Sequence, residues 1–137
     1  MHPLFRLALV FIGGTCGTAL RAALLAIPHD AGARSEVVAL TAINLVGAFL
    51  LGLLLGRVSA AEPRADAARA LLGTGALGGF TSYSALVLFA VPAGGDPVVG
   101  AILALVSLPV GIAAAIFGLR LGGRRGPRPA STTRDLA

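Results

Sequence analysis

Charge is scarce in this sequence, and lysine is absent from it. Of the 137 residues, only 12% are charged whereas 56% are apolar. Soluble domains contain about 45–50% apolar residues, so this chain has too little polar surface to cover itself in water. The single cysteine, Cys16, excludes an intramolecular disulfide. The composition therefore predicts a membrane protein rather than a soluble domain.

Four long apolar stretches make up most of the chain, at about 7–27, 37–56, 70–91 and 98–119. Each is close to the ~20 residues that a helix needs to cross the hydrocarbon core of a bilayer. We therefore predict an all-α membrane protein with four transmembrane helices in one domain, residues 1–121. It is expected to be a multi-pass protein of the plasma membrane. Residues 122–137 are basic and are predicted to form a disordered cytoplasmic tail.

The eleven arginines lie mainly at the ends of the apolar stretches, which is the distribution that insertion into a membrane produces. This placement argues against nucleic-acid binding despite the net charge of +5. If the N-terminus, the middle loop and the C-terminus share one side, nine arginines lie there and two lie opposite, which predicts that both termini are cytoplasmic. The nine are Arg6, Arg57, Arg64, Arg69, Arg120, Arg124, Arg125, Arg128 and Arg134, and the two are Arg21 and Arg34.

Acidic side chains are absent from the four stretches. All six carboxylates fall outside them, and no metal-ligand spacing or catalytic constellation appears, so we expect no enzyme. A small proton-coupled multidrug exporter is a disfavoured alternative, because proton exchange at membrane depth requires an embedded carboxylate. Residues 73–78 match the dinucleotide fingerprint G-x-G-x-x-G, but they lie inside a predicted span and not after a strand, so a nucleotide site is not expected.

Glycines recur at four-residue spacing in three of the predicted helices. The pairs are Gly13 and Gly17, Gly52 and Gly56, and Gly75 and Gly79. In lipid such small-xxx-small pairs let two helix backbones approach closely. They predict tight helix packing and favour oligomerisation.

Polar residues at membrane depth are the main candidates for function. Asn44 lies near the middle of the second stretch, and Thr81, Ser82, Tyr83 and Ser84 lie near the middle of the third. Such groups are costly in lipid, so they should face a protein interior or a water path. Alternatively, Asn44 merely joins helices by hydrogen bonding.

Glycines precede these polar residues of the third stretch, at positions 73, 75, 78 and 79, and weaken a continuous helix. We expect the helix to break there and expose backbone carbonyls that coordinate a cation. An intact helix whose glycines serve packing remains the alternative.

Three motifs, one in each of the first three stretches, resemble those of the Fluc/CrcB family of fluoride channels. Gly17-Thr18-Ala19-Leu20-Arg21 is similar to the first-helix G-x-x-x-R of that family. Asn44-Leu45-Val46-Gly47-Ala48-Phe49-Leu50-Leu51-Gly52 is similar to the second-helix N-x-x-G-x-F-x-x-G. The run from Gly75 to Leu86 resembles the glycine-rich third-helix signature that ends in T-T-F-S-T-F. The motifs occur in the family's order and cover most of the chain.

The resemblance implies a fluoride-specific channel that exports fluoride from the cytoplasm and relieves its toxicity. It implies an antiparallel, dual-topology dimer with two narrow pores and a third helix broken near its middle, at the glycine pair. A structural sodium ion at the dimer centre would be held by the backbone carbonyls of Gly78 and Thr81. The implied vestibule residue is Arg21, and the implied pore residues are Asn44, Ser82, Tyr83, Ser84 and Leu86.

The sequence departs from the family pattern in two respects. The paired pore phenylalanines are replaced by Tyr83 and Leu86, and leucine has no ring quadrupole to offer an anion. The arginine bias also favours one fixed orientation, whereas an antiparallel homodimer needs a nearly balanced chain. We therefore favour a heterodimer with a related subunit of opposite orientation over a homodimer. A non-conducting partner subunit is a further alternative.

Overall fold

The computed structural model describes residues 1–27, 33–58, 64–84 and 97–123, and within these ranges the chain contains helices and no strands. Helix α1 spans Pro3–Leu25, α2 spans Ala33–Arg57 and α6 spans Pro97–Gly122. Between α2 and α6 lie α3 (Ala65–Ala68), the π-helix η1 (Arg69–Leu77) and α4 (Gly78–Phe80), which follow one another without a gap. Most of the predicted tail and the predicted pore residue Leu86 lie outside the described residues.

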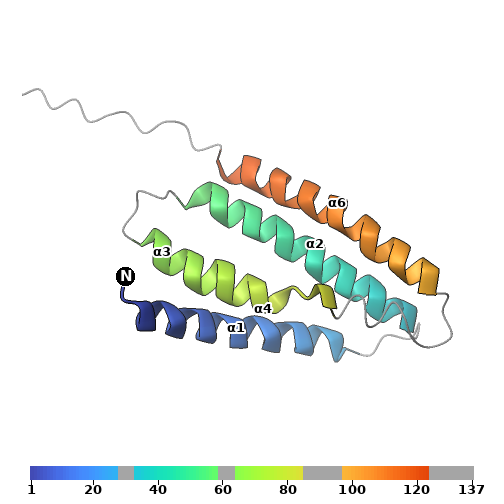
Figure 1. Cartoon of the computed structure of the whole chain (residues 1–137), viewed down its shortest axis with the longest axis horizontal. Helices are drawn as coiled ribbons and strands as arrows, with labels where there is room; N and C mark the ends of the chain where they lie inside the picture. The colour runs from blue at the N-terminus through green and yellow to red at the C-terminus, as the bar shows by residue number, and fades with distance from the viewer. Residues whose placement is uncertain (28–32, 59–63, 85–96, 124–137) are drawn as a thin grey trace, which may run out of the picture.

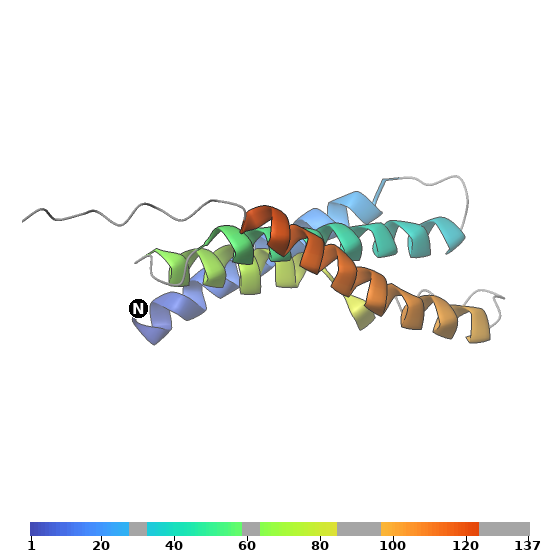
Figure 2. The same ribbon diagram turned by 90° about the horizontal axis from the view of Figure 1, so that it is seen from above.

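The helices lie side by side in one layer. In Figure 1 the order is α1, then the α3–η1–α4 rod, then α2, then α6, and Figure 2 shows that α1 and α6 are inclined in opposite directions relative to α2. The closest packing joins α2 to α6 and α1 to η1 and α4. Successive helices run in opposite directions, so the N-terminus, the start of α3 and the ends of α2 and α6 share one end of the layer (Figure 1).

Glycine backbones form both main contacts between helices. A Cβ at Gly52 or Gly56 would meet the carbonyl oxygen of Ala115 or Leu119 on α6. The same holds on the other side of this contact, where Gly118 faces the carbonyl of Phe49. Backbone atoms cannot move aside as a flexible side chain can, so only glycine allows this approach. The prediction of close packing at the Gly52 and Gly56 pair is confirmed.

Helix α1 meets the third helix in the same way. A Cβ at Gly13 would lie 2.8 Å from the Ala76 nitrogen and 3.0 Å from the Gly75 Cα. A Cβ at Gly75 would in turn lie 2.9 Å from the Val10 carbonyl oxygen, and one at Gly79 would meet the carbonyl oxygen of Gly14. Two of the glycines that weaken the isolated helix, Gly75 and Gly79, therefore allow its backbone to pack closely against α1.

Much of the helix surface is left uncovered by the chain itself. The structure contains three helices long and apolar enough to span a membrane, and only 11–22% of their apolar windows is buried. Large apolar side chains such as Phe11, Leu105 and Phe117 are exposed. In a membrane such surfaces are covered by lipid or by a partner chain. The fourth predicted span, at 70–91, is described only as far as residue 84.

The third helix is interrupted after the glycines and not at them. Gly78 and Gly79 are helical, and the chain leaves the helix at Thr81, which has φ −83° and ψ 146°. Ser82 is also non-helical, and Tyr83 and Ser84 are helical again. The expected interruption is therefore present, but it lies at Thr81, three residues beyond Gly78, while Gly79 packs closely against α1 in helical form.

Candidate functional site

The site is built around the point where the third helix opens. The Thr81 N–H still donates to the Leu77 carbonyl at 3.0 Å, which completes the last helical turn. The Thr81 hydroxyl donates to the same oxygen, also at 3.0 Å. The extended conformation of Thr81 then separates the backbone groups that follow from the helix. Buried backbone groups of this kind need other partners, and side chains from α1 and α2 supply them.

Helix α1 supplies two donors to the carbonyls of the opening. The Thr18 hydroxyl donates to the Gly79 carbonyl at 3.3 Å, and the Arg21 guanidinium donates through Nη1 to the Thr81 carbonyl at 3.3 Å. The two donors come from positions one turn apart on α1 and so share a face. The predicted vestibule residue Arg21 is therefore bonded to the opening itself.

Helix α2 supplies a side-chain amide that pairs with both backbone groups of one residue. The Ser82 N–H donates to Asn44 Oδ1 at 2.8 Å, and Asn44 Nδ2 donates to the Ser82 carbonyl at 3.2 Å. An amide side chain can pair in this way because its donor and its acceptor lie side by side. The pair joins α2 to the opening and fixes the plane of the amide.

Gly47 lies one turn after Asn44 on α2 and makes room for the opening. A Cβ at this position would overlap the Thr81 methyl group and lie 3.4 Å from Phe80 Cδ1. The spacing N-x-x-G therefore places two features on one face of α2: Asn44, which bonds to the Ser82 backbone, and Gly47, which leaves space for the Thr81 side chain. The segment Phe80–Ser82 packs against both.

An open groove of about 380 Å³ lies beside this segment, between α2 and α6. Asn44 lines it, and so does Tyr83, whose side chain is 45% exposed. The Asn44 Nδ2 has two hydrogens, and the bond to Ser82 uses one of them, so the second is available to the groove. The other lining residues are Thr41, Leu45, Gly47, Ala48, Leu51, Thr81, Ser107, Leu108, Gly111, Ile112 and Ala115.

Of the predicted pore residues that the structure describes, only Asn44 and Tyr83 line this groove. The Ser82 and Ser84 hydroxyls lie 3.4 Å from each other and do not belong to its lining. Leu86 is outside the described residues. The groove adds two hydroxyl residues, Thr41 and Ser107, to which the sequence analysis assigned no role. Their signal is weak but present, since both are polar residues within apolar stretches, and Thr41 lies at helical spacing from Asn44.

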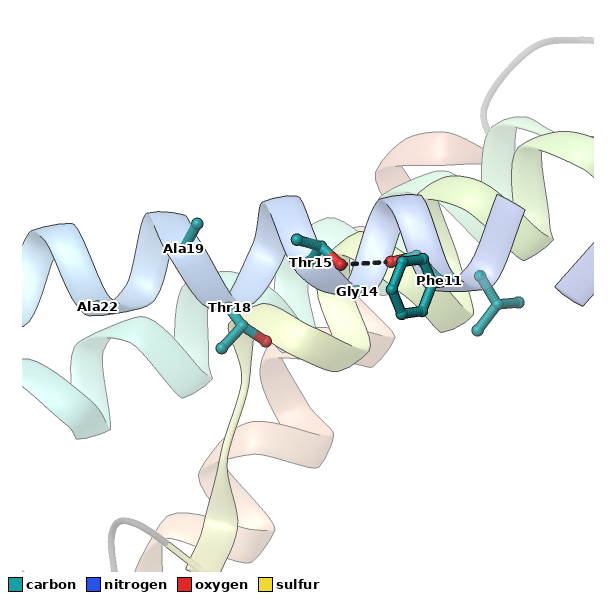
Figure 3. Close-up of a pocket in the computed structure, with 7 residues that line it drawn as sticks. Phe11, Gly14, Thr15, Thr18, Ala19 and Ala22 are labelled. Atoms are coloured by element: carbon teal, nitrogen blue, oxygen red, sulfur yellow. Dashed lines mark hydrogen bonds between the residues drawn. The ribbon is translucent and has the colours of Figure 1, made fainter. Parts of the chain in front are cut away.

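A second hollow, of about 610 Å³, lies along the exposed face of α1 near its contact with the opening (Figure 3). Small residues and two hydroxyls line it. The Thr15 hydroxyl donates to the Phe11 carbonyl of its own helix at 2.9 Å, as the dashed line in Figure 3 shows, while Thr18 reaches across to Gly79. Its lining residues are Val10, Phe11, Gly14, Thr15, Thr18, Ala19 and Ala22. The surface is shallow and mainly apolar.

The predicted sodium ligands are the carbonyls of Gly78 and Thr81. Within the described ranges no cluster of His, Cys, Asp or Glu is suited to a metal, so backbone oxygens are the candidate ligands there. The N–H that would bond to Gly78 in a continuous helix belongs to Ser82 and is given to Asn44, which favours a role for the Gly78 carbonyl as a ligand. The Thr81 carbonyl already accepts from Arg21, but it has a second lone pair. The donor set fits a hard cation, and the charge of Arg21 opposes it.

Comparison with known proteins gives several relatives over most of the chain. A protein of Leifsonia xyli named "Fluoride-specific ion channel FluC 2" is 40% identical over 128 residues, which cover 88% of this chain and 85% of the relative. A protein of Corynebacterium jeikeium with the same name is 37% identical, with 89% and 82% covered. A Thermus thermophilus protein named "Fluoride-specific ion channel FluC" is 36% identical, with 86% and 95% covered. No solved structure gave a significant match.

The family comparison covers the same region. The model of the family described as "CrcB-like protein, Camphor Resistance (CrcB)" matches residues 8–119. This range includes α2, the described part of the third helix and most of α1 and α6, and therefore all of the groove and the opening. The sequence-based expectation of this family is confirmed, and the chain is a member of the CrcB family.

Proposed function

We propose that this chain is a subunit of a fluoride-specific ion channel of the plasma membrane, and that fluoride passes along the groove between α2 and α6. The observation that carries the proposal is the amide of Asn44, fixed by two bonds to Ser82 while it lines the groove. A fixed donor does not have to reorganise when an anion arrives. The names of the relatives, which are fluoride channels, support the same ion.

The groove chemistry suits a small, strongly hydrated anion. To enter, fluoride must exchange its water for N–H and O–H donors that the protein holds in place. Asn44 offers an N–H, Thr41 and Ser107 bring hydroxyls, and Tyr83 brings a ring whose positive edge attracts anions. Within the described residues no carboxylate lines the groove to repel an anion. Arg21, bonded beside the opening, lowers the electrostatic cost of negative charge at this depth.

The proposed orientation places both termini in the cytoplasm. It is supported by the shared end of the layer at which α1 begins and α2 and α6 end (Figure 1), where Arg6, Arg57, Arg64 and Arg120 are located. Basic residues beside membrane helices are retained on the cytoplasmic side. With this orientation, fluoride that leaves the cytoplasm is exported, which would relieve fluoride toxicity.

The proposed assembly is an antiparallel dimer with a structural sodium ion at its centre, held by the Gly78 and Thr81 carbonyls of each subunit. It is supported by the uncovered apolar surface of α1, including the hollow in Figure 3, which adjoins the opening. This pair of carbonyls supplies two ligands, so in the proposed site a second copy or a related chain supplies the others. The excess of arginine at one end favours a related chain of opposite orientation.

Reconstitution separates these alternatives. Purified protein is placed in liposomes loaded with potassium fluoride or, separately, with potassium chloride, and efflux is followed with a fluoride or chloride electrode after addition of valinomycin. We expect fluoride efflux without chloride efflux when this chain is assembled with a related subunit of opposite arginine bias. Rapid efflux from the chain alone would contradict the heterodimer but support the channel.

A non-conducting partner subunit is the second candidate, favoured by the replacement of the two family phenylalanines with Tyr83 and Leu86. In that case a heterodimer would conduct equally well whether or not the groove of this chain is intact. Membership of the CrcB family disfavours the multidrug exporter and confirms that the chain is not an enzyme.

A further inference from the structure

The hydrogen-bond register of the third helix contains a competition for one N–H. The α-helical register continues to Thr81, whose N–H donates to Leu77, four residues earlier. The next bond of this register would join the Ser82 N–H to the Gly78 carbonyl. The Ser82 N–H instead donates to Asn44 Oδ1, at 2.8 Å. A side chain of α2 therefore occupies the donor that would extend the helix by one more residue.

The geometry of Asn44 makes this diversion stable. Its Nδ2 also bonds to the Ser82 carbonyl, so two bonds hold the residue and both must break if Ser82 is to return to the helix. Gly47, one turn away, accommodates the Thr81 methyl, so that the segment lies close enough to α2 for the pair to form. The extended φ and ψ of Thr81 match this path.

We propose that Asn44 is a positioning residue for the cation site: by holding the Ser82 N–H, it keeps the Gly78 carbonyl without its helical donor and thus able to bind sodium. The inference rests on the sodium ion of the proposed function. It gives Asn44 a second role, separate from donation into the groove, through a different atom. Oδ1 holds the opening, and Nδ2 has a second hydrogen, beyond the one bonded to Ser82, for donation in the groove that Asn44 lines.

Carbonyl chemistry explains why the diversion matters. A helical carbonyl that already accepts a hydrogen bond from an N–H is a weaker ligand for a cation. In membrane proteins, sodium is bound by carbonyl oxygens of unwound segments at membrane depth. Without Asn44 Oδ1, the acceptor that would continue the α-helical register for the Ser82 N–H is the Gly78 carbonyl. The helix would then extend and the ligand would be weakened.

The test measures how sodium stabilises the purified dimer. The melting temperature is followed by circular dichroism across a sodium chloride titration, with N-methylglucamine chloride holding the ionic strength constant. Asn44→Leu removes the acceptor at similar size, and Asn44→Asp keeps an oxygen acceptor. We expect Asn44→Leu to raise the half-saturating sodium concentration by about tenfold or more, and Asn44→Asp to bind sodium at least as well as the unsubstituted chain. Unchanged sodium binding by Asn44→Leu would overturn the inference.

A second substitution keeps the test decisive if Asn44→Leu does not fold. Ser82→Pro removes the contested N–H, and Thr81 already has the extended backbone that a residue before proline prefers. Ser82→Pro itself loses the bond to Asn44 Oδ1, but it leaves no N–H for the Gly78 carbonyl, so we expect this variant to be stabilised by sodium as the unsubstituted chain is. For the same reason, we expect Ser82→Pro to restore sodium stabilisation when it is added to Asn44→Leu. Loss of sodium stabilisation in Ser82→Pro alone would overturn the inference.

The outcomes also distinguish this inference from the proposed function. If the unsubstituted dimer shows no sodium stabilisation, both the inference and the sodium part of the proposed function are wrong. Fluoride efflux from liposomes that contain the unsubstituted chain tests the channel separately. Efflux from the unsubstituted chain, together with unchanged sodium binding in Asn44→Leu, would leave the channel standing and remove the role of Asn44 at the cation site.

Discussion

Replacement of Gly118 by alanine is expected to weaken the contact between α2 and α6. The new Cβ would meet the Phe49 carbonyl oxygen and lie 2.9 Å from the Leu53 nitrogen. All of these are backbone atoms of α2, so the helices must move apart. Overpacking of this kind costs about 1–3 kcal/mol in the free energy of unfolding.

Gly111→Ala is the matched control, because it makes the same substitution on the same helix, two turns earlier. A Cβ at Gly111 has no atom within 4 Å. Alanine favours a helix over glycine by up to ~1 kcal/mol, and this gain is common to both variants. The difference between them therefore isolates the packing cost, about 1–3 kcal/mol, or roughly 3–10 °C in melting temperature for a domain of this size.

The assay is thermal unfolding of both variants in the same detergent, followed by circular dichroism. We expect Gly111→Ala to melt at or above the temperature of the unsubstituted chain, and Gly118→Ala to melt below it. If Gly118→Ala is as stable as Gly111→Ala, the close backbone contact between α2 and α6 does not exist in the protein.

Three further substitutions test the site. Asn44→Asp is expected to lower the part of fluoride efflux carried by this chain more than tenfold, because a carboxylate in the groove repels the anion; unchanged efflux would place the anion path elsewhere. Arg21→Met removes a positive charge bonded to the Thr81 carbonyl, so the sodium concentration for half-maximal stabilisation should fall, by about tenfold; a rise would show that Arg21 supports the cation site. Gly47→Ala places a Cβ against the Thr81 methyl and should lower both melting temperature and efflux, and Thr81→Ser, which removes that methyl, should restore both. Failure of this rescue would contradict the docking of the opening on α2.

The helices and their packing surfaces could largely be predicted from the sequence. Apolar runs and glycine spacing depend on local composition, and the Gly13, Gly17, Gly52 and Gly56 positions lie at helix contacts as expected. The matching pair on α6, Gly118 and Gly122, was missed although its spacing is the same. A glycine pair shows that close approach is possible, but it does not show which helix approaches.

The position of the opening could not be predicted from local sequence, because it depends on partners distant in the chain. Glycine propensity pointed to residues 73–79, whereas these residues are helical and two of them, Gly75 and Gly79, pack closely against α1. The helix opens where Asn44, 38 residues away, captures the Ser82 N–H. The two alternatives predicted for Asn44, joining helices by hydrogen bonding and facing a polar path, are compatible: Asn44 bonds to the third helix and also lines the groove.

The groove lining shows a similar limit. Thr41 and Ser107 are visible in the sequence as polar residues in apolar stretches, but one sequence does not show which way each faces. Ser84 illustrates the opposite case, since it stands in the motif and yet does not line the groove. The motifs predicted which part of the chain forms the site. Which motif residues line the groove depends on how α6 packs against α2.

The central claim is that fluoride passes along the groove of this chain. Its most direct test is to measure fluoride and chloride efflux from liposomes that contain the conducting dimer, with this groove either open or filled by a side chain. Gly111→Leu fills it, because Gly111 lines the groove and has open space around it. The account predicts rapid fluoride efflux without chloride efflux from the open form, and a loss of the part carried by this chain in Gly111→Leu at unchanged melting temperature. Equal fluoride efflux from the open and filled forms would contradict it.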